Sequence, residues 1–566
     1  MFNTTAEKTT AVVLAIGAPL TTLFLTTGGV TDPVNATKLF VAGGFGFALI
    51  SVLIGFQARE TFSHFKAYVL SSLVFIATAL NTVISSGSPI TQNLYGSFGR
   101  NTGFIAYLVF MFASLGVLGL RNKSNFKKLI LGLQFAGIVN VAYCAWVIAF
   151  GDFLSWNNPY GNILGLFGNP NFVSSFLGIF IATVLAFAAN RNASWRYRGA
   201  ALLVCLLAFY EIVNSNAIQG IVVTAGGIVL IGFFYVRANI KAIAVSYLYA
   251  LLAIGLGTLA IFGALQKGPF SFVYKTSVSL RGAYWAAGTK MGLDHPFTGV
   301  GMDSYGDWYR RARSLNAATV LPGPNTFTNA SHNVVIDFFA YGGWPLLLSY
   351  LGLVTIALIS AIKVILRSRN YDPIFVAIFT GWVCYLTQSL ISINQIGLAI
   401  WGWLLTGALV AYEFATRPES GSDEVSQSKK KKQRANKSTE VVSPQLIAGL
   451  GMVVGLIVAV PPLSADMKWR AALDSKDVNK VLQAVEPGYL SPSDSTRYVQ
   501  AVQLFATNNF PEQAREVALN AIAYNPDHFE SWRLFYFLTN TSTEEKAKAL
   551  ENMKRLDPLN PDISAQ

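Results

Sequence analysis

The chain has 566 residues, of which 53% are hydrophobic and only 13% are charged. Soluble domains carry about 25% charged residues, so this composition excludes an ordinary soluble enzyme and favours a protein that spans a membrane many times. The formal net charge of +13 invites a nucleic-acid interpretation, but cytoplasmic loops that follow the positive-inside rule explain it better. The excess lies in the apolar part, since residues 466–566 hold 11 Lys/Arg against 14 Asp/Glu. We therefore expect no nucleic-acid partner.

Apolar runs recur along the chain and predict an all-α, polytopic fold with about thirteen membrane spans, because each run is long enough to cross a hydrocarbon core. We place the spans near residues 9–26, 38–56, 67–86, 103–120, 128–150, 172–190, 199–214, 218–236, 241–264, 344–366, 373–391, 395–414 and 445–463. The three cysteines lie inside these runs at positions 144, 205 and 384. They predict neither a disulfide framework nor a metal site.

Lysine and arginine fall on alternate connections between the apolar runs. The basic connections contain Arg59 and Lys66; Arg121, Lys123, Lys127 and Lys128; Arg191, Arg196 and Arg198; Arg237 and Lys241; Lys363, Arg367 and Arg369; and Arg417 with the following lysine run. The other short connections carry almost no cations, with Arg100 as the main exception. This alternation predicts a multi-pass protein of the plasma membrane with a cytoplasmic N-terminus and an external C-terminus.

The predicted domain boundaries follow changes in composition. Residues 1–414 form the multi-spanning domain, and their external loop at 265–333 holds the candidate chemistry. Residues 415–443 are polar and rich in charge, which is typical of a disordered linker, here a basic one on the cytoplasmic side. The run Lys429–Lys432 either acts as a topogenic signal or contacts anionic lipid head groups.

The last hundred residues change in character. After a final transmembrane helix at 444–463, residues 464–566 form an external domain that is predicted to be soluble and helical. The segment Ser495–Asn525 has Ala, Leu and aromatic residues at helical spacing, and its Asn-Pro punctuation recurs about 35 positions later, a period that indicates tetratricopeptide-like helix pairs. We expect this domain to support the membrane part or to bind a protein partner, and not to carry chemistry.

The stretch Ser279–Pro345 is the longest between hydrophobic runs, and it opens with a candidate phosphate-binding helix. Arg281, Tyr284, Trp285 and Gly288 are spaced at i, i+3, i+4 and i+7, which places them on one face of a short helix. A guanidinium grips phosphate through a planar, bidentate fork. The alternative for this arginine is an interfacial side chain that snorkels to the head groups.

Further along, the segment HPFTGVGMDSYGDWY has Gly299 and Gly301 after a proline, a pattern that predicts a tight, irregular turn held in part by His295. A basic cluster follows this turn. It either binds substrate or lies at the lipid interface, and its members are Arg310, Arg311 and Arg313, with Lys290 upstream.

His332, in the segment ASHNVV, lies where the polar loop meets an apolar helix. A histidine with an ordinary pKa of about 6.5 can take a proton from a sugar hydroxyl there, although a helix-capping or interfacial histidine is the alternative. No acidic pair of the DxD type occurs on the external side, where Asp303 and Asp307 are four apart, so we expect a reaction without a metal. Glu211 and Asp337 are the only carboxylates near mid-span or span ends, which disfavours a transporter.

Three motifs resemble a known family. The segments RGAYW with HPFTGVGMDSY, and then HNVVIDFFAYGGWPL, are similar to the signature region of bacterial O-antigen ligases, O-antigen polymerases and protein O-oligosaccharyltransferases. The segment LFGNPNFVSSFL is similar to a Gly-Asn-Pro-Asn element of many members. The resemblance covers about residues 10–414 and implies a glycosyltransferase of C-type fold in the bacterial inner membrane. Such enzymes pass a glycan from undecaprenyl pyrophosphate, on the outer face, to lipid A core, to another glycan or to a protein hydroxyl.

The same resemblance implies roles for single residues. Arg281 matches the family arginine that holds pyrophosphate, and His332 matches the essential histidine that would activate the acceptor hydroxyl. Configuration at the anomeric carbon would invert, and no cofactor is needed because the lipid diphosphate is already activated. The expected substrate-binding residues are Tyr284, Trp285, Lys290, Arg310, Arg311, Arg313 and Asn333.

Two departures from the family pattern concern charge. Many members carry an arginine in a turn where this chain has NSNAIQG, with Asn216 and Gln219. A second phosphate contact would then have to come from Arg100, Lys290 or the basic cluster. An acidic residue of the histidine motif is replaced by Tyr341.

The sequence therefore favours a transferase of ligase or polymerase type, with a lipid-linked glycan donor, a glycan or glycolipid acceptor and membrane lipids as its partners. A protein O-oligosaccharyltransferase is the nearest alternative, for which the helical tail would dock the acceptor. From other classes, a transporter of lipid-linked glycan predicts charges along a path through the spans, and a membrane scaffold predicts that the external loop is dispensable.

Overall fold

The computed structural model describes residues 3–271, 276–418 and 442–564, and the regular secondary structure in these ranges is helical. The helices are α1 (Thr4–Leu23), α2 (Asn35–Phe56), α3 (Ala58–Ser85), α4 (Ile90–Tyr95), α5 (Phe104–Val117), α6 (Lys123–Phe150), η1 (Gly165–Phe167), α7 (Pro170–Ala188), α8 (Trp195–Asn214), α9 (Ile218–Asn239), α10 (Ile243–Ala264), α11 (Thr276–Asp294), α12 (Tyr305–Ala312), α13 (Leu315–Thr319), α14 (Val334–Arg367), α15 (Pro373–Ser389), α16 (Ile396–Ala415), α18 (Pro444–Ser475), α19 (Val478–Val485), α20 (Ser495–Thr507), α21 (Pro511–Tyr524), α22 (Phe529–Phe537), α23 (Thr543–Leu556) and α24 (Pro561–Ser564).

Ten helices within the described ranges are long and apolar enough to cross a membrane: α2, α3, α6, α7, α8, α9, α10, α14, α16 and α18. The chain is therefore an all-helical, polytopic membrane protein, as the composition predicts. Helices α5 and α15 are apolar but shorter, and α1 falls in neither group. The predicted count of about thirteen spans is not confirmed.

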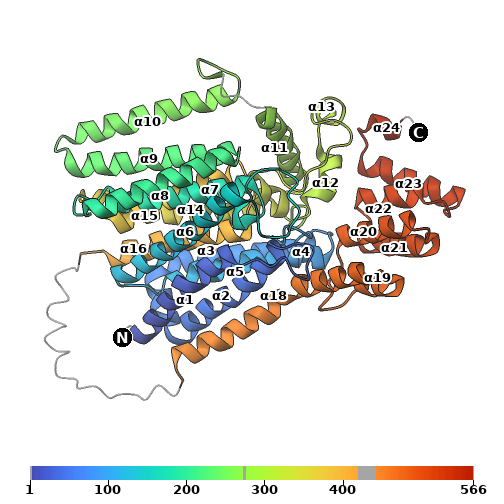
Figure 1. Cartoon of the computed structure of the whole chain (residues 1–566), viewed down its shortest axis with the longest axis horizontal. Helices are drawn as coiled ribbons and strands as arrows, with labels where there is room; N and C mark the ends of the chain where they lie inside the picture. Colours follow the sequence, from blue (N-terminus) through green and yellow to red (C-terminus); the bar gives the residue numbers. More distant parts are fainter. Residues whose placement is uncertain (1–2, 272–275, 419–441, 565–566) are drawn as a thin grey trace.

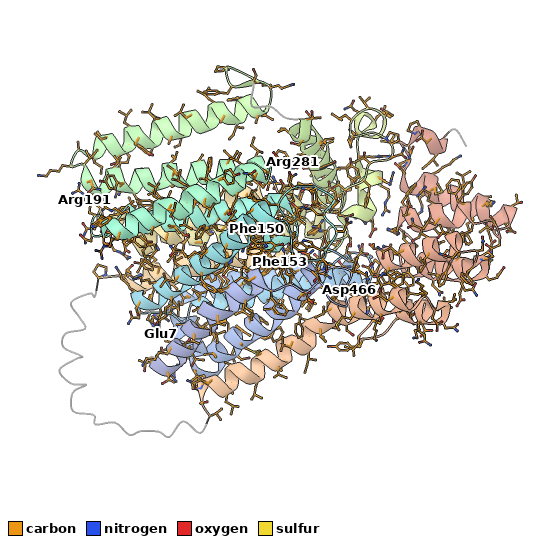
Figure 2. All side chains as sticks on the ribbon, viewed as in Figure 1. Glu7, Phe150, Phe153, Arg191, Arg281 and Asp466 are labelled. Carbon is orange, nitrogen blue, oxygen red and sulfur yellow. The ribbon has the colours of Figure 1, made fainter. Side chains whose placement is uncertain are left out.

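The apolar helices lie side by side with their long axes roughly aligned, and the C-terminal helices α19–α24 gather beyond one end of this bundle (Figure 1). Helix α18 lies along α2, and α10 packs on α9 at the opposite edge. Figure 2 shows Arg281 and Asp466 toward the end that adjoins the C-terminal helices, and Arg191 and Glu7 toward the other end. The two ends of the bundle therefore carry different residues, and the candidate residues of the long loop lie at the end that adjoins the C-terminal helices.

Helix α18 packs on α2 through small residues. Gly451, Gly455 and Ala459 are four apart, so they lie on one face of α18. A Cβ atom added at Gly455 would lie 2.1 Å from the carbonyl oxygen of Gly43, which means that the two backbones approach more closely than a larger side chain allows. This contact fixes the last apolar helix, which carries the C-terminal domain, against the start of the chain.

The same helix extends beyond the predicted boundary at residue 463 and runs without a break to Ser475. The buried carboxylate of Asp466 accepts hydrogen bonds from the backbone N–H groups of Thr31, at 3.0 Å, and Asp32, at 2.9 Å. The helix thus holds the loop that precedes α2, and it joins the bundle to the C-terminal domain as one rigid element.

Helix α14 kinks at Gly342–Gly343, and the predicted turn around Gly299 fits into the kink. The N–H of Val300 donates to the carbonyl of Ala340 at 2.9 Å, which occupies an acceptor that the kink frees. Gly299 has φ +62°, and a Cβ atom there would lie 2.1 Å from the carbonyl oxygen of Tyr341. The predicted tight turn is confirmed, and the segments HPFTGVG and YGGWP pack against each other.

The C-terminal helices form a second hydrophobic core, which contains Trp469, Phe505 and Trp532. Helix α20 packs on α21 and α22 packs on α23, so successive helices pair. The assignment of these pairs to the tetratricopeptide family stays a prediction. Of the predicted linker, residues 419–441 with the Lys429–Lys432 run lie outside the described residues.

Candidate active site

His332 lies on a turn that is tightly held on both sides. The N–H and the hydroxyl of Ser331 both donate to Asp337 Oδ1, at 2.8 Å each. The side chain of Asn333 caps α14 by accepting from the N–H groups of the second and third residues of that helix, at 3.0 and 3.3 Å. His332 itself has φ +58°, a conformation uncommon for a residue other than glycine, which persists when its neighbours over-determine it. The fold therefore fixes the backbone that carries the imidazole.

The half-buried imidazole borders a cavity of about 490 Å³. Helices begin at the walls of this cavity: α2 at Asn35, α7 just after Asn169, and α14 just after His332 and its neighbour. Helix N-termini present backbone N–H groups without intrahelical partners and the positive ends of helix dipoles, so their convergence favours an anionic ligand. Asp32, the one carboxylate among the described lining residues, is engaged in capping α2 through the N–H groups of Val34 and Asn35.

The Gly-Asn-Pro-Asn element builds one of these helix starts. Gly168 has φ +70°, Asn169 accepts from the N–H of Asn171 at 2.9 Å as the cap, and Pro170 occupies the first turn of α7. The amide of Asn169 also donates to the hydroxyl of Tyr160 at 3.0 Å, across the cavity wall. The resemblance in this element thus has a physical reason, because it starts a helix at the cavity.

Arg100, from the loop between α4 and α5, is the cation that lines the cavity beside His332. Its Nε lies 3.2 Å from Asp303 Oδ1, and its other nitrogens donate to the carbonyl of Asn329 and, at 3.3 Å, to the hydroxyl of Tyr341. Burial is the largest single effect on the pKa of Arg100 and would lower it, but the charge of Asp303 and smaller contributions from other nearby groups together outweigh burial and raise the pKa. For Asp303 the effect of burial prevails, so its pKa is raised even though the charge of Arg100 lowers it. The guanidinium is therefore permanently charged and firmly positioned.

His332 is kept neutral by its surroundings. Burial is the largest cause, and the charges of Arg281 and Arg100 add to it, so the pKa of His332 falls to about 4. The ring of Tyr284 lies 5.9 Å from the imidazole, centroid to centroid, and Tyr305 donates to the carbonyl of Tyr284 at 2.5 Å. A neutral imidazole that feels the charges of two guanidinium groups is able to accept a proton when an anion screens those cations.

Arg281 lies on α11 at the end of the bundle that adjoins the C-terminal helices (Figure 2). Burial lowers its pKa and the nearby Tyr284 opposes this change. Arg281 is not among the residues that line the cavity, although its charge acts on His332. Trp285 has a buried Nε1 with no hydrogen-bond partner in the described part of the chain. The structure thus brings Arg281, Tyr284 and His332 together.

The other predicted substrate-binding cations are engaged elsewhere. Lys290 is exposed and pairs with Asp294 at 2.8 Å. The cluster of Arg310, Arg311 and Arg313 faces the C-terminal domain, where its members pair with Asp557 at 2.9 Å, Asp527 at 3.4 Å and Asp557 at 2.7 Å, respectively. A substrate contact by these four cations stays a prediction, and the structure gives each of them a carboxylate partner.

In the turn that departs from the family pattern, the polar side chains form hydrogen bonds with uncharged partners. Asn216, with φ +55°, donates to the side chain of Asn162 at 2.6 Å, and Gln219 accepts from Ser175 at 3.2 Å. Ser175 lies on α7, so this turn packs against the helix that starts at the cavity. Neither residue lines the cavity.

Sequence reasoning named Arg100 only as one substitute among several. Its signal was a single cation in a connection that otherwise lacks them. Its pairing with Asp303, about two hundred positions away, leaves no local pattern, so only the tertiary structure assigns it to the cavity of His332.

These features define a class of protein: a polytopic membrane protein in which a neutral histidine lies at one end of the bundle, beside a fixed cation and several helix N-termini. Residues 203–351, which include Arg281 and His332, match the family described as O-Antigen ligase. Residues 203–351 therefore carry an O-antigen ligase family domain, and that family consists of glycosyltransferases that use a lipid-linked glycan. No curated protein matches the chain.

Proposed function

We propose that this chain transfers a glycan from undecaprenyl pyrophosphate to an acceptor hydroxyl, with inversion and without a metal, as a ligase or polymerase of the O-antigen type. The observation that carries the proposal is the neutral His332 at the wall of a cavity that Arg100 and several helix N-termini prepare for an anion. Family membership supports a lipid-linked donor and an acceptor.

In the proposed reaction the pyrophosphate of the donor occupies the cationic side of the cavity. Breaking the bond between the anomeric carbon and the phosphate oxygen places additional negative charge on the leaving pyrophosphate. Fixed guanidinium groups at Arg281 and Arg100 stabilise that charge more in the transition state than in the ground state, which is the requirement for catalysis. Both charges act on His332, so both lie near the reaction centre.

His332 serves as the general base. Its neutral imidazole takes the proton of the acceptor hydroxyl while the hydroxyl oxygen attacks the anomeric carbon from the side opposite to the pyrophosphate, which inverts the configuration. A pKa of about 4 makes a weak base in the empty cavity. The negative charge of bound pyrophosphate offsets the two arginines and raises the pKa of His332, so donor binding prepares the base.

The proposed orientation has the His332 end of the bundle outside the bacterial plasma membrane, with the N-terminus in the cytoplasm and the C-terminal domain external. The support is the positive-inside rule, since Arg191 lies at the end away from the cavity (Figure 2), and Arg237 and Arg369 lie close to Asn190, the residue before it. About thirteen spans and a C-type glycosyltransferase fold belong to the same proposal.

A protein acceptor is the second candidate, and a specific observation favours it. A further cavity of about 230 Å³ lies between the long loop and the C-terminal domain, lined by Phe327 and Asn329 on one side and by Asp494 and Phe529 on the other. Phe327 and Asn329 also line the cavity of His332. An acceptor held by the C-terminal helices would therefore reach the reaction centre directly.

The decisive test is glycan transfer in proteoliposomes that contain undecaprenyl-pyrophosphate glycan and either a lipid A core or a peptide acceptor. We expect His332→Ala and Arg281→Ala to abolish transfer, with donor binding weakened mainly by the arginine change. His64→Ala and Arg196→Ala are matched controls, because both side chains are exposed and lie outside the cavity. Transfer that survives in His332→Ala would overturn the mechanism, and the acceptor that is used separates the two candidates.

A further inference from the structure

A second cavity lies at the opposite end of the bundle and has a different character. Its volume is about 620 Å³, and it is lined by the ends of α6, α9, α14, α15 and α16. Helix α14 runs from the His332 turn to this cavity, over 34 residues or about 50 Å of helix. Four cationic side chains and one carboxylate line it, namely Lys123, Arg237, Arg367, Arg369 and Asp372.

Two of these cations have carboxylate partners. Lys123 pairs with Asp372 at 2.9 Å, and Asp372 also accepts from the hydroxyl of Tyr412 at 2.6 Å. Arg367 pairs with Glu413 at 3.2 Å. The first pair is balanced in charge, whereas Glu413 also pairs with Arg417, at 2.6 Å. These contacts hold the ends of α6, α14 and α16 together.

Arg237 and Arg369 have no carboxylate partner among the described residues. Among the described residues, Arg237 donates only to the carbonyl of Ile365, at 2.8 Å, and Arg369 donates only to backbone carbonyls at the end of α9, Ile240 among them at 3.0 Å. Arg369 therefore also serves as a cap for α9. Neither guanidinium forms an ion pair within that part of the chain.

The lack of a counterion among the described residues is clearest at Arg237. The residue is only 7% exposed, and its Nε has no hydrogen-bond partner in the described ranges. A buried guanidinium without a counterion is costly, and in a membrane protein such a group marks a site for an ion or ligand. The cavity beside it has room for that counterion.

The shape and surroundings of the cavity select the kind of anion. Its wall combines the two guanidinium groups with the apolar side chains of Phe234, Val364 and Phe375. It lies at the ends of helices that are long and apolar enough to cross a membrane, and helices of that length end near the lipid head groups. Basic pockets between such helices bind phosphate-bearing head groups. We propose that this cavity binds the phosphodiester head group of an anionic lipid, with Arg237 and Arg369 as its counterions and the apolar wall in contact with the start of an acyl chain.

The test uses the full chain in detergent, with bound lipid counted by native mass spectrometry and with unfolding temperature as a second readout. Phosphatidylglycerol and cardiolipin are the probes, phosphatidylcholine is the zwitterionic comparison, and inorganic phosphate is the soluble one. We expect anionic lipid to bind tightly to the wild type and at least tenfold more weakly to the double variant Arg237→Gln/Arg369→Gln. Lys127→Gln removes one charge from the exposed surface of α6, outside the cavity, and should bind as the wild type does.

Arg237→Lys keeps the charge and removes the planar fork, so we expect intermediate binding in a chain that still folds. If the double variant fails to fold, the wild type alone decides, since anionic lipid must raise its unfolding temperature in a salt-dependent manner. Equal stabilisation by phosphatidylcholine, or by inorganic phosphate without lipid, would overturn the proposal. So would anionic-lipid binding that is unchanged in a folded double variant.

Discussion

Arg313 of the long loop donates through Nη2 to both carboxylate oxygens of Asp557 in the C-terminal domain, with N–O distances of 2.7 and 2.8 Å and no solvent exposure of either side chain. Arg310 donates to the same carboxylate at 2.9 Å. Residues separated by 244 positions thus share one buried charge cluster. The loop that ends in His332 is therefore anchored to the domain that follows the last membrane helix.

Asp557→Asn tests this anchor. The change leaves two guanidinium groups without their counterion, and breaking a buried pair in this way costs about 3–5 kcal/mol. We expect faster cleavage of the C-terminal domain in limited proteolysis and a large loss of glycan transfer. Asp562→Asn, at an exposed position of α24, is the control. Transfer and protease resistance equal to wild type in Asp557→Asn would show that the anchor has no role.

The pH dependence of transfer tests the state of His332. Its pKa is lowered to about 4 in the empty cavity, so His332 is neutral above that pH and charged only below it. The value of kcat/KM should therefore fall only as the pH drops toward about 4. Bound pyrophosphate raises the pKa of His332, so kcat should fall at a higher pH than kcat/KM does. Identical acid limbs in both profiles would contradict the proposed coupling between donor and base.

Arg100→Lys tests the second cation of the cavity. Lysine keeps the charge but loses the fork that now contacts Asp303, Asn329 and Tyr341. We expect about a hundredfold loss of kcat/KM, as is typical when one stabilising donor is removed, with weaker binding of a soluble pyrophosphate-glycan analogue. Unfolding temperature separates this effect from misfolding. Unchanged donor binding in a folded Arg100→Lys variant would remove Arg100 from the pyrophosphate site.

Gly455→Leu tests the packing of α18 on α2. Every rotamer of leucine collides with the backbone of Gly43, because even a Cβ atom would lie 2.1 Å from its carbonyl oxygen. We expect an unfolding temperature that is several degrees lower, since overpacking costs about 1–3 kcal/mol or more. Gly449→Leu is the matched control on the same helix, where an added Cβ meets nothing within 4 Å. Equal stability of the two variants would contradict the close helix contact.

Much of the site was predictable because its signals are local. The turn at Gly299 follows from the glycines and proline around it, and the placement of His332 at the junction of loop and helix follows from the change in composition there. The sequence left Arg310, Arg311 and Arg313 open between substrate binding and the lipid interface, and only their charge made them substrate candidates. Their partners Asp527 and Asp557 lie more than two hundred positions away, so no local sequence pattern predicts the pairing.

The sequence by itself determined that this chain is helical, that it spans a membrane, and that it carries the paired motifs of a glycan transferase, because hydropathy, turn residues and motif spacing are properties of short segments. Only the tertiary structure decided that Arg100 stands beside His332 and that the C-terminal domain anchors the long loop. It also decided that Arg237 and Arg369, which have no ion-pair partner among the described residues, line a cavity at the far end of the bundle. Each of these relationships joins segments from different helices, and their geometry arises only when the apolar helices pack.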